Sequence, residues 1–162
     1  DKGSKDGLKK GMNIMAGSGL VGIITDVGPN YAKVRSIIDD SANVSAMVTT
    51  TGDNMNVSGN LQTMNSDQAI TFSELRDSED KVQIGDPVVT SYVSDQYQQG
   101  ILIGYIASIE SDSNKLTKSG TITPVVDFEH MENVLVILDT KETGDSTQTE
   151  SSGDSSTQTT EQ

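Results

Sequence analysis

The sequence contains no cysteine and no tryptophan, a single histidine, and only 4% aromatic residues among its 162 residues. Without cysteine there is no disulfide scaffold and no thiolate metal site. A Ser-His-Asp triad would have to use His130, which sits in a short polar turn typical of exposed surface. The absence of tryptophan also argues against a sugar-binding platform of aromatic side chains. The scarcity of these residue types argues against most common classes of catalytic and glycan-binding protein.

Basic residues are also scarce, with 11 Lys and Arg against 24 Asp and Glu, a formal net charge of −13. An acidic chain without a basic stripe repels phosphate backbones, so we expect no nucleic-acid binding. Residues 141–162 lack Val, Ile, Leu, Met, Phe and Tyr, and this acidic Ser/Thr/Gln-rich tail is predicted to be disordered. No apolar run is long enough for a membrane span or a signal peptide. Because the first residue is Asp1 rather than Met, we expect a fragment of a longer protein.

Short apolar strands between Gly, Asn and Asp turns fill the rest of the chain, without a long amphipathic helix. This pattern predicts an all-β protein of barrel or sandwich type. The motif Leu20-Val21-Gly22-Ile23-Ile24 recurs as Leu102-Ile103-Gly104-Tyr105-Ile106. We therefore predict two small tandem β-barrel-like domains, residues 1–76 (truncated at the N-terminus) and 77–140, with the disordered tail after them.

Several local expectations follow from the same pattern. Residues 44–51 and 55–64 read as a hairpin, and the uniformly apolar segment 134–138 reads as a strand buried on both faces. A glycine in an apolar strand marks a bend or a close backbone approach, and other glycines mark turns. The structural glycines expected on these grounds are Gly7, Gly11, Gly22, Gly28, Gly85 and Gly104.

Catalytic and metal-binding patterns are weak. The acidic clusters Asp39-Asp40 and 77–80 lack the spacing of a calcium loop. A Gly-x-Gly-x-x-Gly match at 17–22 precedes a strand, so it has no helix N-terminus to receive a pyrophosphate. No catalytic, cofactor-binding or metal-binding residue is assigned, and no cofactor is expected. The alternative function is a wall-associated hydrolase, pairing Asp39 or Asp40 with Glu74 or Asp77, or a glycan-binding β-domain.

A partner-binding surface is predicted around the polar segment 94–99. The apolar and aromatic residues that flank it are Tyr92, Tyr97, Ile101 and Leu102. Exposed aromatic side chains beside an apolar run are candidates for protein contacts. The alternative, that both tyrosines cap the core, is equally compatible with the sequence.

Taken together, several motifs resemble the extracytoplasmic core of the MreC family of rod shape-determining proteins. They are Asp1-Lys2-Gly3-Ser4-Lys5-Asp6-Gly7-Leu8-Lys9-Lys10-Gly11-Met12, Gly19-Leu20-Val21-Gly22-Ile23-Ile24, Val27-Gly28-Pro29-Asn30, Val82-Gln83-Ile84-Gly85-Asp86-Pro87-Val88-Val89-Thr90-Ser91, Gly104-Tyr105-Ile106 and Glu132-Asn133-Val134-Leu135-Val136-Ile137. They keep the order of the family and cover nearly all of the chain before the tail, which itself departs from the family pattern.

The resemblance implies a non-enzymatic scaffold of the cell-wall elongation machinery that maintains rod shape. It implies a single-pass parent protein anchored in the cell membrane, with a coiled coil and two β-domains on the extracytoplasmic face. The partners it implies are the membrane protein MreD, the class B penicillin-binding transpeptidase, the glycosyltransferase RodA and the actin-like MreB. It also implies a homodimer or higher self-association.

Overall fold

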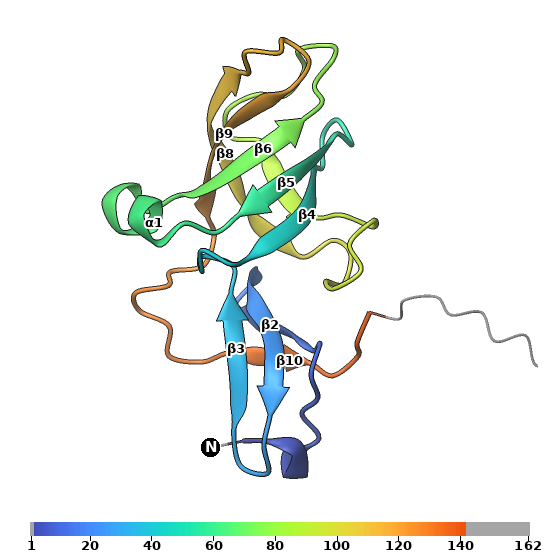
Figure 1. Cartoon of the computed structure of the whole chain (residues 1–162), viewed down its shortest axis with the longest axis vertical. Coiled ribbons are helices and arrows are strands. Elements are labelled where there is room, and N and C mark those ends of the chain that lie inside the picture. Colours follow the sequence, from blue (N-terminus) through green and yellow to red (C-terminus); the bar gives the residue numbers. More distant parts are fainter. Residues whose placement is uncertain (1, 142–162) are drawn as a thin grey trace, which may run out of the picture.

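The structure, a computed structural model, describes residues 2–141 and contains one continuous sheet of ten strands. A 3₁₀ turn, η1 (Ser4–Asp6), and one short helix, α1 (Leu61–Asp67), accompany the sheet (Figure 1). The strands are β1 (Asn13–Ala16), β2 (Gly19–Val27), β3 (Ala32–Ser36), β4 (Asn43–Val48), β5 (Asn54–Ser58), β6 (Ile70–Leu75), β7 (Pro87–Thr90), β8 (Leu102–Ser111), β9 (Lys118–Pro124) and β10 (Leu135–Ile137).

Six of these strands close into a barrel. They pair in the order β8-β7-β4-β5-β6-β9, and an additional antiparallel pairing of β8 with β9 closes the ring. Register shifts at Val88/Val89, Phe72/Leu75 and Ile106/Ser108 interrupt the ladders. Such bulges increase local twist, which lets a short sheet curl onto itself. We call this unit the barrel.

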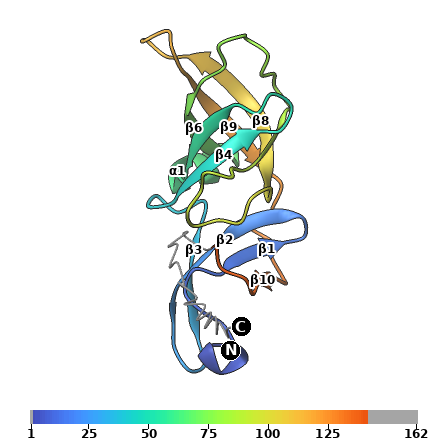
Figure 2. The ribbon, with the colours of Figure 1, turned by 90° about the vertical axis from the view of Figure 1, so that its right-hand side faces the viewer.

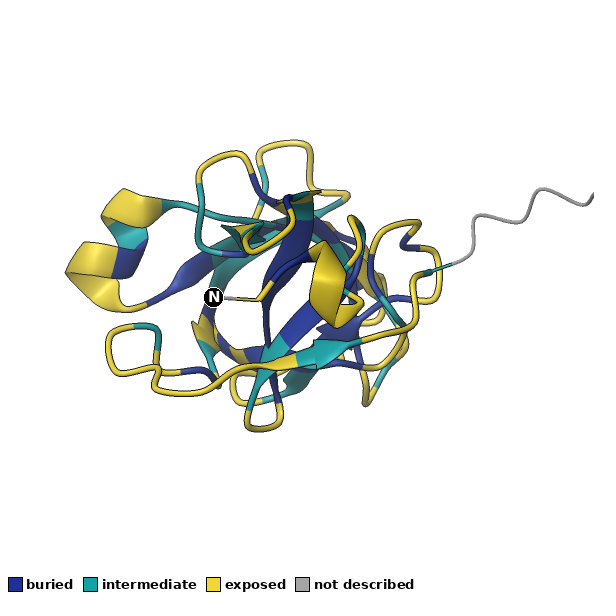
Figure 3. Ribbon diagram, turned by 90° about the horizontal axis from the view of Figure 1, so that it is seen from below, coloured by how far each residue is buried: buried dark blue, intermediate teal, exposed yellow. Residues whose placement is uncertain are grey.

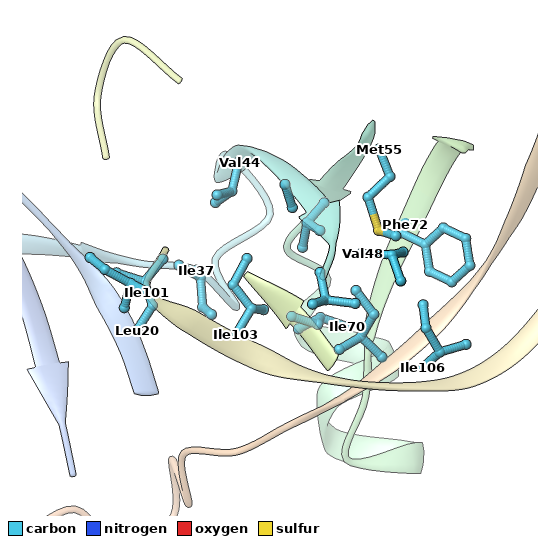
Figure 4. Close-up of a cluster of buried hydrophobic side chains, with 14 of the residues drawn as sticks. Leu20, Ile37, Val44, Val48, Met55, Ile70, Phe72, Ile101, Ile103 and Ile106 are labelled. Carbon is cyan, nitrogen blue, oxygen red and sulfur yellow. The ribbon is translucent and has the colours of Figure 1, made fainter. Parts of the chain in front are cut away.

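The barrel interior is filled by every second residue of its strands. In β4, Val44, Ala46 and Val48 are buried while their neighbours face outward, as the two-residue period of a strand requires. In Figure 4, Val48 lies beside Phe72 of β6 and near Ile106 of β8, within one cluster of buried side chains. Burying a large apolar side chain contributes roughly 1.5–3 kcal/mol, so this cluster is the main source of stability.

The remaining strands form a smaller antiparallel unit, β10-β1-β2-β3, which we call the small sheet. It lies at one end of the barrel (Figure 2) and is joined to it by a parallel bridge between Gly19 of β2 and Leu102 of β8. A second apolar cluster, which includes Met12, Ile14 and Ile24, packs on this unit.

The prediction of an all-β, barrel-type fold is confirmed, but the strands divide differently from the expected boundary at residues 76–77. Strand β4 pairs with β7, β6 pairs with β9, and the C-terminal β10 returns to β1. The charged segment 76–81 is therefore a connection within the barrel rather than a linker between units. Closing the ring requires partners for β4 and β6, and the later strands supply them. The predicted tail, beyond Lys141, lies outside the described residues.

Two local predictions are corrected. Strand β5 ends at Ser58, and Asn60 then accepts a hydrogen bond from the Thr63 amide, which caps α1 within the segment expected to be a strand. The segment 134–138 is not buried on both faces, because Leu135 and Leu138 are 67% and 64% exposed. Its strand, β10, lies at the edge of the small sheet and pairs with β1.

The two repeated glycines occupy equivalent surroundings. A Cβ atom on Gly22 would lie 2.2 Å from the carbonyl oxygen of Arg35, and one on Gly104 would lie 2.1 Å from that of Thr123. Both contacts are with the neighbouring strand, so the requirement for glycine is close backbone approach. The other predicted glycines lie in turns or loops: Gly7, Gly11 and Gly85, each at positive φ, and Gly28, against the Tyr31 ring.

We therefore expect Gly22→Val and Gly104→Val each to lower the free energy of unfolding by more than about 1 kcal/mol, because the neighbouring strand must move aside. Chemical denaturation measures this loss. Ala107→Val, at an exposed position of β8, is the control for adding a β-branched side chain to the strand. Glycine variants as stable as the parent would contradict the close-approach argument.

Candidate partner-binding surface

The predicted surface falls on residues 91–101, which connect β7 to β8 and which we call the junction loop. Two of the predicted contact residues are buried: Tyr97 is 1% exposed and Ile101 is 7% exposed. Figure 4 shows Ile101 beside Leu20 and Ile37, where the barrel meets the small sheet. Tyr97 and Ile101 therefore anchor the loop in the core and are not surface contacts. For Tyr97, the core-capping alternative is the correct one.

A buried asparagine of the small sheet fastens the junction loop. The side-chain amide nitrogen of Asn13 donates to the Gln96 carbonyl at 3.0 Å, and its amide oxygen accepts from the Gln98 backbone NH at 2.7 Å. Asn13 is 1% exposed. Buried polar groups are costly unless they are paired, so these two bonds fix the loop against β1.

Short polar side chains fasten the loop to the barrel as well. The buried Thr90 hydroxyl donates to the Gln98 carbonyl at 2.6 Å and accepts from the Ile101 amide at 2.8 Å. Within the loop itself, the Ser94 hydroxyl accepts from the Tyr97 amide at 3.0 Å. Neither Thr90 nor Asn13 was among the contact residues predicted from the sequence. Small polar residues directly after an apolar strand could have pointed to Thr90 as a residue that holds the loop. No local sequence pattern in β1 marks Asn13.

The exposed part of the loop is short and apolar. Tyr92 and Val93 are 59% and 56% exposed at its tip, whereas Leu102 is half-buried in β8. Of the four predicted contact residues, Tyr92 is therefore the one that is exposed. Val93 also lines a hollow of about 900 Å³ with polar side chains of β4, β5 and the loop, including Asn56 and Gln96. The tip thus presents two apolar side chains beside a polar groove.

The carboxylates proposed for a hydrolase do not form one site. Glu74 lines the 900 Å³ hollow, which is not lined by Asp39 or Asp40. Asp40 accepts from the Leu61 amide at 2.8 Å and so caps α1, and Asp39 accepts from the backbone NH of Ser41. These bonds give both aspartates a structural role. In Figure 3, α1 is exposed over most of its surface.

The remaining catalytic candidates are equally unsupported. His130 is exposed, and its Nδ1 lies 3.0 Å from an Asp127 carboxylate oxygen; this contact lowers the pKa of Asp127. Among residues 2–141, no group of three or more His, Cys, Asp or Glu side chains is arranged to hold a metal ion.

Asp77 is held in a buried ion pair that pins the β6–β7 connection. Its carboxylate accepts from the amides of Lys81 and Val82 at 2.8 and 3.1 Å and from the Lys118 ammonium at 2.9 Å. Its side chain is 1% exposed. Burial raises the pKa of Asp77, but the Lys118 bond and the two amides outweigh it and lower the pKa below 3.8. Lys118 also pairs with Asp80.

The lowered pKa sets a pH dependence of stability. The contribution of ionised Asp77 is complete above pH 3.8, its ordinary value, and is lost as the pH falls through the lower folded-state pKa. We expect Asp77→Asn to lose about 1–3 kcal/mol at pH 7 and to show a flatter decline of stability below about pH 4. Denaturation series from pH 7 to pH 2 measure both effects.

The control is Asp26→Asn, which changes an exposed carboxylate on β2. It should leave both the stability at pH 7 and the acid decline as in the parent. An Asp77→Asn variant with the parent's pH profile would show that the ion pair does not stabilise the β6–β7 connection.

No helix within residues 2–141 has the length and apolar character needed to cross a membrane.

Comparison with known proteins identifies the family. The profile described as "Rod shape-determining protein MreC, barrel core" matches residues 1–138. The cell shape-determining protein MreC of Listeria monocytogenes is 32% identical over 146 residues, which cover 89% of this chain and 48% of that protein. The MreC of Bacillus subtilis is 36% identical over 81 residues, 46% of this chain and 28% of that protein. The chain thus spans half or less of the length of these relatives.

Solved structures agree in fold. MreC from Listeria monocytogenes superposes with a TM-score of 0.74 at 31% identity, covering 84% of this chain and 64% of that chain. MreC from Pseudomonas aeruginosa superposes with a TM-score of 0.72 at 22% identity, covering 85% of each chain. The chain therefore belongs to the MreC family of rod shape-determining proteins.

Proposed function

We propose that this chain is a non-enzymatic docking module of a cell-shape scaffold, and that it binds a class B penicillin-binding transpeptidase. The observation that carries the proposal is the exposed Tyr92–Val93 pair at the tip of a loop whose base is buried. A similar fold occurs in a structure described as a complex between penicillin-binding protein PBP2 and MreC from Helicobacter pylori, with a TM-score of 0.61 at 16% identity.

The physical argument for docking is preorganisation. An apolar contact on a mobile loop must offset the entropy of ordering that loop when a partner binds. Here Tyr97 and Ile101 already hold the base of the junction loop in the core, and Asn13 fixes its middle. Tyr92 and Val93 are thus presented at low entropic cost. Exposed aromatic side chains of this kind commonly dominate interface energies.

The non-enzymatic part of the proposal is supported by the roles of the acidic residues. Asp40 caps α1, Asp77 pins the β6–β7 connection, and His130 lies on the exposed surface. Glu74 lines the 900 Å³ hollow, but none of Asp39, Asp40 and Asp77 lines it with Glu74 to form the acid–base pair that a hydrolase would need.

We further propose the setting of the whole protein, of which this chain spans a part. It would be anchored in the cell membrane with this portion on the extracytoplasmic face, where it would join the transpeptidase to MreD and RodA. A link through the membrane to MreB and self-association into dimers complete the proposed scaffold.

The variant Leu116→Cys tests the location, because Leu116 is exposed. We expect a membrane-impermeant maleimide to label this variant in intact cells. Labelling only after the cells are lysed would contradict the extracytoplasmic location.

The test of docking is the affinity of this chain for the purified extracytoplasmic region of the transpeptidase, measured by interferometry. We expect the double variant Tyr92→Glu/Val93→Glu to bind at least tenfold more weakly, because each change places a charge in an apolar contact. Tenfold corresponds to about 1.4 kcal/mol, below the ~2 kcal/mol of a typical hot spot.

Two variants serve as matched controls. Leu116→Glu places the same charge at an 80% exposed apolar side chain in the β8–β9 connection, and His130→Ala removes the single histidine. Both should bind like the parent. Parent-like binding by the double variant, or loss of binding with His130→Ala, would overturn the proposed surface.

A further inference from the structure

A small basic hollow lies beside the junction loop and adjoins the Tyr92–Val93 tip, because its lining residue Lys141 bonds to the Tyr92 carbonyl. Its volume is about 210 Å³, and its charged lining residues are Lys10, Arg35, Lys141 and Asp95. Three cations around one carboxylate stand out in a chain with a net charge of −13. Such a local excess of positive charge attracts anions.

Arg35 is the central residue of this hollow. It lies on β3 opposite Ile23 of β2, and its Nε is buried without a hydrogen-bond partner among the described residues. Buried donors are normally paired, so an unpaired one requires an explanation. The guanidinium group presents a planar fork of donors that matches a carboxylate or a phosphate.

The two lysines approach the hollow from segments far apart in the sequence. Lys10 is placed by the next residue, because the Gly11 amide donates to the Ile24 carbonyl at 2.8 Å. Lys141 is placed by its ammonium, which donates to the Tyr92 carbonyl at 3.3 Å. Together with Arg35 they bring positive charge from before β1, from β3 and from after β10.

The nearby carboxylates do not neutralise this charge. Asp95 is the one acidic residue in the lining. Asp39 is close enough to Arg35 for the arginine to help lower its pKa, but the main cause is its bonds to Ser41. Those bonds, to the Ser41 hydroxyl and amide at 2.5 and 2.8 Å, occupy one oxygen of the Asp39 carboxylate.

We propose that this hollow binds a single oxyanion group, a carboxylate or a phosphate, with the Arg35 guanidinium as its main donor and Lys10 and Lys141 as flanking cations. Its volume is below the ~300–1,000 Å³ of pockets for drug-sized ligands, which suits one anionic group. Because its lining includes β2, β3 and the junction loop residues Asp95 and Gln96, a bound anion would link the small sheet to that loop. The site goes beyond transpeptidase docking and does not depend on it.

The sequence allows a direct test, since Arg35 and Arg76 are the two arginines of the chain. Their Nε–Hε signals in a ¹⁵N NMR spectrum report on each site separately, with exposed Arg76 as the internal control. Sodium phosphate and sodium acetate are titrated into the full chain at constant ionic strength, with sodium chloride as the reference salt.

We expect the Arg35 signal to shift and saturate with one or both oxyanions while the Arg76 signal stays in place. Comparing the phosphate titration with the acetate titration shows which oxyanion the site binds more tightly. The double variant Lys10→Gln/Lys141→Gln should weaken the binding about tenfold. Equal, unsaturated shifts of both arginine signals would indicate charge screening alone and would overturn the proposal. An Arg35 signal that moves neither with added oxyanion nor in the variant described below would also overturn it.

A final arm asks whether the anion comes from the chain itself. The acidic residues after Lys141 are Glu142, Asp145, Glu150, Asp154 and Glu161, and they are changed together to their amides in the full chain. If the Arg35 signal moves in this variant before any anion is added, the chain's own carboxylates fill the hollow. If it stays in place and then responds to added oxyanion, the group comes from another molecule. Each result supports an oxyanion site and assigns its source.

Discussion

The buried side chain of Asn13 joins the small sheet to the barrel, and the arrangement at their junction depends on it. Its amide group bonds both to the carbonyl of Gln96 and to the backbone NH of Gln98. Losing the Asn13 side chain would leave these part-buried backbone groups without their partners, at a cost of about 1–2 kcal/mol. With it in place, Tyr97 remains in the core, where burial raises the pKa of its hydroxyl.

Two surfaces follow from this constraint. On the exposed side of the junction loop, Tyr92 and Val93 project from a base that is already ordered. On the other, Asp95 and Gln96 border the hollow around Arg35. The Asn13 bonds fix the loop against β1, so both surfaces are built on a segment that is already ordered.

The sequence predicted those features that depend on local pattern. The strands at the two repeated motifs, Leu20–Ile24 and Leu102–Ile106, and the glycines of tight turns follow from apolar pattern and turn chemistry, and the structure contains them. The repeated glycines also pointed correctly to close strand contacts. Pairings between distant strands, such as β10 with β1, have no local signature, so the division into units was misplaced.

The candidate site shows the same limit. Tyr92 and Tyr97 have similar sequence surroundings, yet one is 59% exposed and the other 1% exposed. Tyr97 belongs to an apolar cluster whose other members, such as Leu20 and Ile37, come from far earlier in the chain. Likewise, 134–138 is apolar throughout, but its strand lies at the sheet edge, so composition alone overestimated its burial.

Hydrogen–deuterium exchange on Asn13→Ala tests most directly the claim that Asn13 orders the junction loop. We expect the amides of residues 94–99 to exchange at least tenfold faster than in the parent, since loss of about 1.4 kcal/mol raises the open population tenfold. Amides of β5 and β6, in the barrel wall, should keep their parental protection. Unchanged exchange at 94–99, or uniformly faster exchange across the barrel, would contradict the claim.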